Sequence, residues 1–170
     1  MSGSGAPARR VGLLLVAVAV AASGCAGQDQ QGSPAHRMSV WVGGTGLGGA
    51  IGTLNADNAR VALDVPNGTG AVHAACGTIE VDADMANGEL PSPDAQVNDW
   101  LSKAYGLEGT AATECYNAGA TNTALLARSA RNRAKAHGLF QRALIRIQSI
   151  TGRPVATTTT TDNATGGIFG

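Results

Sequence analysis

A proline-free segment near the end of the chain places the strongest constraint on the fold. It reads TNTALLARSARNRAKAHGLFQRALIRIQSITG and opens with Thr121 and Asn122, both of types that cap helix N-termini. Gly152 followed by Pro154 is a typical helix stop. The apolar residues between recur at helical spacing and predict one broad buried face: Leu125, Leu126, Ala130, Leu139, Phe140, Ala143, Leu144, Ile147 and Ile150. We therefore expect a helix of roughly 28 residues, about 42 Å long at 1.5 Å per residue.

Two further helices are predicted before this one. The first begins at Asp94, a capping residue, and continues through SPDAQVNDWLSKAYGLEGTAATECY, where Gly106 and Gly109 could kink it. Its apolar positions are Val97, Trp100 or Leu101, Ala104, Leu107 or Glu108, Ala111 and Cys115. The second spans residues 70–87, with an apolar face of Val72, Cys76, Ile79, Ala83 and Met85 or Ala86.

The segment from 38 to 65 predicts an additional, glycine-diluted helix. Ile51, Leu54, Asn58 and Val61 follow helical spacing, and the turn-forming residues 66–70 come after them. Only 4% of the chain is aromatic, so a core must be built from closely packed small residues. Short connections favour antiparallel neighbours. The sequence thus predicts an all-α domain over residues 38–152, a small antiparallel bundle of three to four helices.

The start of the chain predicts an export signal. Arg9 and Arg10 precede a twelve-residue apolar stretch, residues 11–22, which is too short to span a hydrocarbon core. The following Ala22-Ser23-Gly24-Cys25 resembles the lipobox of bacterial lipoproteins, although that family prefers Leu where this chain has Ala22. The resemblance implies cleavage after residue 24 and a diacylglycerol on Cys25, hence a chain outside the cytoplasm held at the cell membrane. The alternative is an ordinary secretory signal that ends near a cysteine.

The segments that flank the expected domain are polar. Residues 25–37 would comprise the lipidated cysteine and a flexible tether, and the Thr- and Gly-rich residues 153–170 predict a disordered tail. In its Ala- and Gly-rich composition, the chain resembles small lipoproteins of high-GC Gram-positive bacteria.

Cysteine number then predicts one internal disulfide. If Cys25 carries lipid, Cys76 and Cys115 remain as a pair in an oxidising compartment. A bridge between them would close a loop worth roughly 4 kcal/mol in the loop-entropy model. Two free thiols or a metal pair are the alternatives, but neither cysteine has a metal-binding spacing.

Charge is divided along the chain. Between Glu80 and Glu114 acidic residues dominate, whereas residues 119–153 contain basic residues and no acid. The charges could neutralise one another within the bundle, which is the interpretation we favour. Alternatively, the basic face contacts anionic lipid, an acidic envelope polymer or an envelope protein, through Arg128, Arg131, Arg133, Lys135, Arg142 and Arg146. We expect no nucleic-acid partner, because the location is wrong.

One glycine pattern suggests a nucleotide site. Gly44, Gly46 and Gly49 have the spacing of a dinucleotide-binding turn after SVWV, and Asp64 follows at a suitable distance. No second strand follows to complete the βαβ unit that this motif requires. The other interpretation is that small residues here let a helix approach a neighbour closely.

Nothing else in the sequence indicates catalysis, and we expect no metal or cofactor. His73 and His137 belong to different helices, and Ser129 and Ser149 lack a nucleophile context. The acidic cluster of Glu80, Asp82 and Asp84 fits a solvated helix face. The expected function is therefore a binding or interaction module at the cell envelope, not an enzyme. A carrier of an apolar ligand between the helices is the alternative, and a dinucleotide-binding enzyme is a weaker one.

Overall fold

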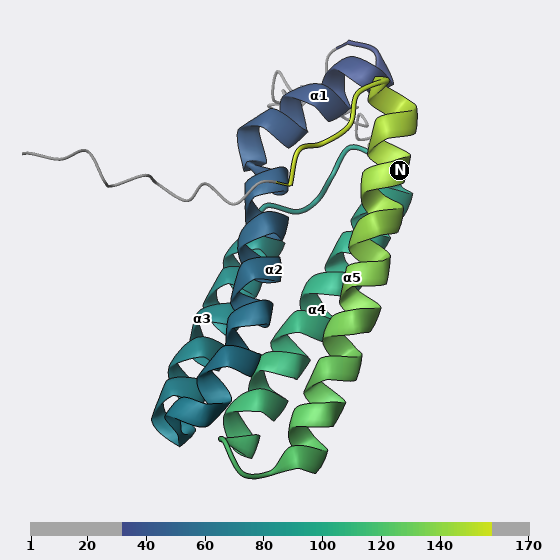
Figure 1. Ribbon diagram of the computed structural model, residues 1–170. Helices are drawn as coiled ribbons and strands as arrows, with labels where there is room; N and C mark the ends of the chain where they lie inside the picture. Colours follow the sequence, from purple (N-terminus) through teal and green to yellow (C-terminus); the bar gives the residue numbers. More distant parts are fainter. Residues whose placement is uncertain (1–31, 158–170) are drawn as a thin grey trace, which may run out of the picture.

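The computed structural model describes residues 32–157. Within this range the secondary structure is all-helical, without a strand: α1 (Pro34–Thr45), α2 (Leu47–Asp64), a 3-10 turn η2 (Val65–Asn67), α3 (Thr69–Gly88), α4 (Ala95–Ala118) and α5 (Thr123–Thr151). Figure 1 shows α2 to α5 running alongside one another, while α1 crosses the end at which α5 finishes. The expected bundle of three to four helices is roughly consistent with this arrangement.

The caps behave as the sequence predicts. The Asp94 carboxylate accepts hydrogen bonds from the backbone N–H groups of Gln96 and Val97, at 3.1 and 2.9 Å, and so starts α4. Asn122 accepts from Leu125 N at the start of α5, and Gly152 ends that helix in the left-handed conformation. Helix α4 is unbroken through its two glycines.

The boundaries at the α1 end differ from expectation. Helix α1 begins at Pro34, so the last four residues of the expected tether are helical, with Ser33 as their cap. Gly46, at φ 61°, separates α1 from α2 where we expected one ambiguous helix. Beyond α5, Val155 packs against the core, so the first residues of the expected disordered tail are ordered; the rest of that tail lies outside the described residues.

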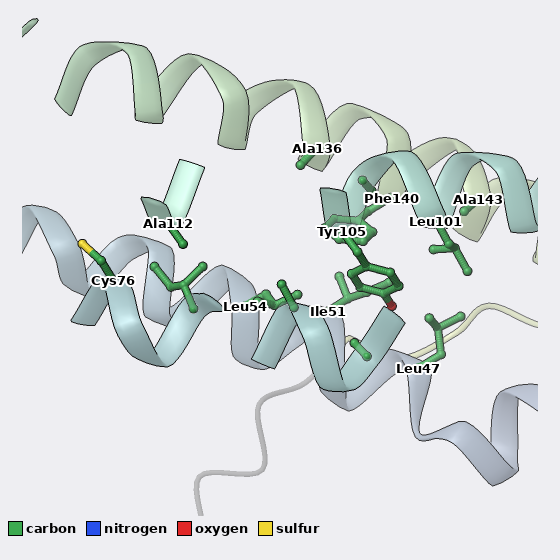
Figure 2. Close-up of a cluster of buried hydrophobic side chains, with 14 of the residues drawn as sticks. Leu47, Ile51, Leu54, Cys76, Leu101, Tyr105, Ala112, Ala136, Phe140 and Ala143 are labelled. Carbon is green, nitrogen blue, oxygen red and sulfur yellow. The ribbon is translucent and has the colours of Figure 1, made fainter. Parts of the chain in front are cut away.

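The core is filled largely by small and aliphatic side chains. Figure 2 shows Leu47, Ile51 and Leu54 of α2 facing Tyr105 of α4 and Phe140 of α5. Alanines make up a large part of the buried core, among them Ala104, Ala112, Ala136 and Ala143. Such a core leaves the helices close together, as the low aromatic content requires.

One expectation about a buried face is wrong, and three open alternatives are resolved. Ala130 was expected in the core but is exposed, and Ser129 is buried in its place. Where two residues competed for a position, Ala86 rather than Met85, Leu101 rather than Trp100, and Glu108 rather than Leu107 are the buried ones. Because a helix has 3.6 residues per turn, spacing alone does not decide which of two adjacent residues faces the core.

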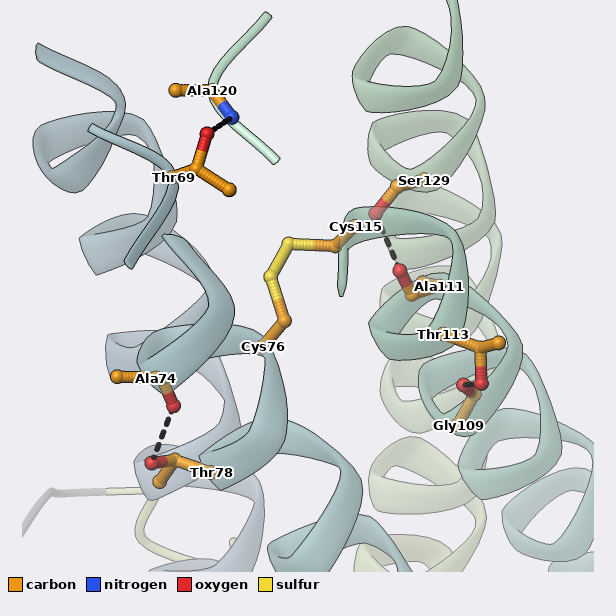
Figure 3. The surroundings of a disulfide bond; sticks show 10 residues. All are labelled: Thr69, Ala74, Cys76, Thr78, Gly109, Ala111, Thr113, Cys115, Ala120 and Ser129. Carbon is orange, nitrogen blue, oxygen red and sulfur yellow. Dashed lines mark hydrogen bonds between the residues drawn. A yellow bond between two sulfur atoms is a disulfide. The ribbon is translucent and has the colours of Figure 1, made fainter. Parts of the chain in front are cut away.

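Cys76 of α3 and Cys115 of α4 form the predicted disulfide. Their Cα atoms are 5.9 Å apart, and both side chains are fully buried. Figure 3 shows the bridge, with two hydrogen bonds that align the neighbouring helices: Ser129 Oγ donates to Ala111 O at 2.7 Å, and Ala120 N donates to Thr69 Oγ1 at 3.2 Å. Together these contacts fix the relative levels of α3, α4 and α5.

Candidate functional site

The six basic residues singled out on α5 fall into two sets of three. Arg128, Arg133 and Arg146, the inner set, are directed toward acidic residues of α4. Arg131, Lys135 and Arg142, the outer set, are exposed. The structure therefore divides a group that the sequence presented as one.

Two members of the inner set form ion pairs. Arg128 Nε lies 2.6 Å from Glu114 Oε1, and Asn132 donates to the other oxygen of the same carboxylate. Arg146 Nη2 lies 3.0 Å from Asp94 Oδ2. Both acids are mostly buried, whereas the arginines remain about half exposed, with side-chain exposures of 56% and 44%. These pairs support the prediction that charges are partly neutralised within the bundle.

The Asp94 carboxylate has two roles, because it caps α4 and also binds Arg146. Its partial burial by itself raises the pKa. The hydrogen bonds from Arg146 and from the N–H groups of Val97 and Gln96 outweigh that effect and hold the pKa of Asp94 below its ordinary value. The carboxylate is therefore stabilised in its ionised form, and the contact stabilises the fold only while Asp94 is charged.

The third inner residue belongs to a buried polar cluster. Glu108 is only 1% exposed, and its Oε2 accepts a hydrogen bond from Asn58 Nδ2 at 3.0 Å. Burial raises the pKa of Glu108, while the Asn58 hydrogen bond and the nearby charge of Arg133 oppose that rise. Burial likewise lowers the pKa of Arg133, which the charge of Glu108 opposes. The cluster joins α2, α4 and α5 across the core.

This cluster is incompletely satisfied. Asn58 Oδ1 and Arg133 Nη1 are buried without a hydrogen-bond partner among the described residues. On the α3 side of α2, Asp57 Oδ2 is also buried without a partner among the described residues. Burial, and after it the neighbouring Asp82 carboxylate, raises the pKa of Asp57. Buried polar groups without partners cost stability, so this part of the core is less favourable than the apolar remainder.

The outer set occupies one stripe of the α5 surface. Its members are four and seven residues apart, which places them on the same face of a helix. Within residues 32–157 none of the three makes a salt bridge. Ile145, a large apolar side chain that is 65% exposed, lies on the same side of the helix. The outer set is thus available to a partner.

The glycine pattern does not lie in a dinucleotide-binding turn. SVWV lies within α1, so the strand that a dinucleotide-binding turn requires is not present there. A Cβ at Gly48, beside the pattern, would collide with the backbone oxygen of Ala156. Close approach therefore applies at Gly48, whereas no such neighbour lies within 4 Å of a Cβ built at Gly44, Gly46 or Gly49. Gly46 instead adopts the left-handed conformation between α1 and α2. A groove of about 360 Å³ remains between α1, the start of α2 and residues 151–156.

The other candidate groups are dispersed. His73 stacks on Tyr116 with ring centroids 4.1 Å apart, while His137 lies exposed on α5 near Gln141. Glu80 and Asp84 are exposed as expected, whereas Asp82 is half-buried beside Asp57. In the described part of the chain, no three His, Cys, Asp or Glu residues are placed to hold a metal ion. Nor is any helix there sufficiently long and apolar to cross a membrane.

Some residues of the site were not recognised from the sequence. The helical spacing allowed either Leu107 or Glu108 at one position of the buried face. That position was the only sequence indication that the carboxylate of Glu108 is buried. Asn58 was included in the face of its helix but not as a partner of Glu108. Cys25 lies outside the described residues, so its lipidation stays a prediction.

Comparison of the chain with protein-family models, with curated proteins and with solved structures finds no match.

Proposed function

We propose that the protein is an exported lipoprotein that is held at the cell membrane by a diacylglycerol on Cys25 and acts as a binding module of the cell envelope. The lipobox-like Ala22-Ser23-Gly24-Cys25 supports the anchor. The Cys76–Cys115 disulfide is in keeping with an oxidising compartment outside the cytoplasm. The folded part is then a small antiparallel helical bundle presented on the outer side of the membrane.

The outer set is the contact surface in this proposal, and its partner carries negative charge. The observation behind it is the contrast within α5: three basic residues have acidic neighbours on α4, while Arg131, Lys135 and Arg142 are exposed on one face and make no salt bridge in the described region. Near an anionic surface each such side chain contributes about 1 kcal/mol. The three together correspond to about a hundredfold in binding.

The anchor would bring this face close to the membrane. Six residues lie between Cys25 and Gly32, where the described chain begins, and the seven Cα–Cα steps between the two can span at most about 25 Å. The end of the molecule that carries α1 is therefore the membrane-proximal end. The outer set extends along the side of the bundle from there, covering about 16 Å between Arg131 and Arg142.

Two experiments test the two parts of the proposal. Fatty-acid labelling of cells should mark the wild-type protein and not Cys25→Ser, and equal labelling of both would refute the anchor. For the contact face, residues 25–170 with Cys25→Ser can be mixed with vesicles of anionic lipid. Retention should fall about a hundredfold in the triple variant Arg131→Gln/Lys135→Gln/Arg142→Gln and should weaken with added salt.

The matched control changes two inner residues that are already paired with acids of the same chain. Arg128→Gln/Arg146→Gln removes two charges from the same helix, so a purely non-specific charge effect would reduce retention comparably. Retention that depends equally on inner and outer residues would contradict the assignment. Vesicles of neutral lipid should retain none of the variants.

The two alternative functions gain no specific support. A carrier needs an enclosed apolar space, and the core described above is filled by its own side chains. A dinucleotide site lacks the strand before its glycines. We therefore develop neither.

A further inference from the structure

Helix α3 presents an outer face that is the electrostatic counterpart of the outer set. Val81 and Met85 are 57% and 68% exposed on this face. Glu80 and Asp84 flank them, are exposed, and make no salt bridge within the described residues. We call these four residues the α3 face. It combines exposed apolar side chains with negative charge, as α5 combines them with positive charge.

The surface of α5 beside the outer set has room for such side chains. Ala134 and Gly138 lie on the solvent side of α5, and no atom of a neighbouring side chain lies within 4 Å of a Cβ built at Gly138. Small residues of this kind let another helix approach closely and receive larger side chains between them. Arg131 and Lys135 lie three residues before Ala134 and Gly138, and Arg142 lies four residues after Gly138, so the outer set borders this strip.

The two faces are in register with each other. Ala120 N donates to Thr69 Oγ1, which joins the start of α3 to the turn just before α5. Near this end, a residue of α3 therefore lies at the same height along the bundle as the residue 51 positions later. Both helices then rise about 1.5 Å per residue in the same direction, because α4 runs antiparallel to each. Glu80 is 51 positions before Arg131, and Asp84 is 51 positions before Lys135, so each acid of the α3 face lies at the height of one base of the outer set.

The rest of the α3 face follows the same alignment. Met85 falls at the level between Ala134 and Gly138, where the α5 surface is shallowest. Glu89, at the end of α3, falls within about 3 Å of the level of Arg142. The disulfide joins α3 to α4, and the Ser129–Ala111 hydrogen bond joins α5 to α4. Together they give the same alignment of α3 with α5 to within about one helical turn.

The two faces are solvent-exposed and belong to helices on opposite sides of the bundle. Helices α3 and α5 lie at opposite edges of the molecule in Figure 1, and α4 packs against both. A second copy displaced sideways, without rotation, therefore brings its α3 face to the outer set of the first. Copies anchored in one membrane by the same end are oriented alike, so they are related by such a displacement.

We propose that the acidic partner of the outer set is the α3 face of another copy of this chain. The inference rests on the proposed function, since it names the partner of the same surface. Acid and base then pair at Glu80–Arg131 and Asp84–Lys135, while Met85 enters the strip between Ala134 and Gly138. Because the two contacting surfaces differ, the contact does not close on itself and extends into rows of molecules along the membrane.

The test uses the full chain on intact cells, with a cysteine on each face. Gly88 and Gly138 are exposed, lie within about 2 Å of the same level, and have open space at the Cβ position. We expect Gly88→Cys/Gly138→Cys to form a disulfide-linked ladder of dimers and larger species on oxidation. Each single variant, and the control Gly106→Cys/Gly138→Cys, should form at least tenfold less; a ladder in the control as strong as in the test pair would overturn the proposal.

Charge exchange decides whether the pairing is the one proposed. Adding Arg131→Glu/Lys135→Glu should reduce the ladder at least tenfold. Adding Glu80→Lys/Asp84→Lys to that same chain should restore it, and this recovery also shows that the reversed chain folds. A ladder that is absent from the start, is insensitive to reversal, or is not restored by the exchange contradicts the inference.

The outcome also separates this inference from the proposed function. If wild type and outer-set variants differ in vesicle retention but no ladder forms, the outer set binds an anionic surface and the α3 face is not its partner. If reversal of the outer set changes neither the ladder nor the retention, both proposals fail.

Discussion

The inner and outer basic sets of α5 each contribute three cations to the same helix, yet they have different surroundings. Arg128, Arg133 and Arg146 lie at levels where α4 supplies Glu114, Glu108 and Asp94. No acidic side chain of the described chain lies within salt-bridge distance of the outer set.

For Arg128, Lys135 and Arg146, which share one side of α5, position along α4 decides which cation meets an acid. Lys135 lies on nearly the same side of α5 as Arg128 and Arg146 but makes no salt bridge in the described region. A basic helix of this kind can therefore stabilise its own fold with some residues and leave others for a partner. The predictions below separate the two uses.

The largest expected effect is at Arg133. Arg133→Gln leaves Glu108, which is 1% exposed, without its nearby positive charge. Loss of one member of a fully buried pair costs 3–5 kcal/mol, and because Arg133 is only half-buried we expect about 2 kcal/mol in the free energy of unfolding. Urea denaturation checks this, with Arg131→Gln as the outer control, which should stay within about 0.5 kcal/mol.

The same variant has a signed dependence on pH. The pKa of Glu108 is raised by burial, so its ionisation disfavours the folded state, and this cost disappears as the pH falls below the unfolded-state value. The destabilisation by Arg133→Gln should therefore shrink toward low pH. In Glu108→Gln the penalty is absent, so the variant should gain stability relative to wild type as the pH rises. A pH-independent difference for both variants would contradict the role of the buried charge.

The next effect is at Asp94. Asp94→Ala removes both the cap of α4 and the Arg146 ion pair and should cost about 1.5 kcal/mol, whereas Asp94→Asn keeps a capping oxygen and should cost less. Because the pKa of Asp94 is lowered in the folded state, its contribution is present above the unfolded-state pKa and is lost as the pH falls through the folded-state value. Thermal unfolding of the two variants between neutral and acidic pH provides the measurement. Equal stability of both at neutral pH would show that the cap contributes nothing.

A smaller effect is expected at Arg128. Its guanidinium is mostly solvated, with a side-chain exposure of 56%, and Asn132 still donates to Glu114 after Arg128→Gln. We expect a loss of about 0.5 kcal/mol in the free energy of unfolding, which should decrease in high salt. A loss as large as that at Arg133 would show that burial does not distinguish the inner residues.

The smallest effect on stability should come from the outer set. The triple variant Arg131→Gln/Lys135→Gln/Arg142→Gln should unfold within about 0.5 kcal/mol of wild type, because these side chains have no acidic partner in the described bundle. Calorimetric unfolding checks this. A larger loss would mean that the outer residues contribute to folding and are not reserved for binding.

Much of the fold follows from local signals. Asp94, Asn122 and Gly152 set three helix ends where their side-chain and backbone chemistry predicts. The break at Gly46 was not predicted, because a glycine within a glycine-rich run gives no local sign that it alone adopts the left-handed conformation. The burial of Ser129 in place of Ala130 depends on the level of Ala111 in another helix, which periodicity does not report.

For the candidate site, the sequence predicted which residues are charged but not which of them pair. The sequence indicates that α5 is basic and its predecessors acidic, and it names all six cations. Which of them meet an acid depends on the alignment of α4 with α5, and that alignment arises from tertiary contacts such as Tyr105 against Phe140. The sequence therefore left internal neutralisation and external binding as alternatives. In the structure, the inner set faces acids of α4 and the outer set is exposed.

The most direct test of this division is cross-linking on intact cells, with the yield expressed per folded molecule for wild type, the outer triple variant and Arg128→Gln/Arg146→Gln. We expect the outer variant to keep wild-type stability and to lose most of its cross-links, whether these are to other copies or to another envelope component. The inner variant should be less stable and keep its cross-links. Equal yields from the two variants would contradict the division of α5 into stabilising and binding residues.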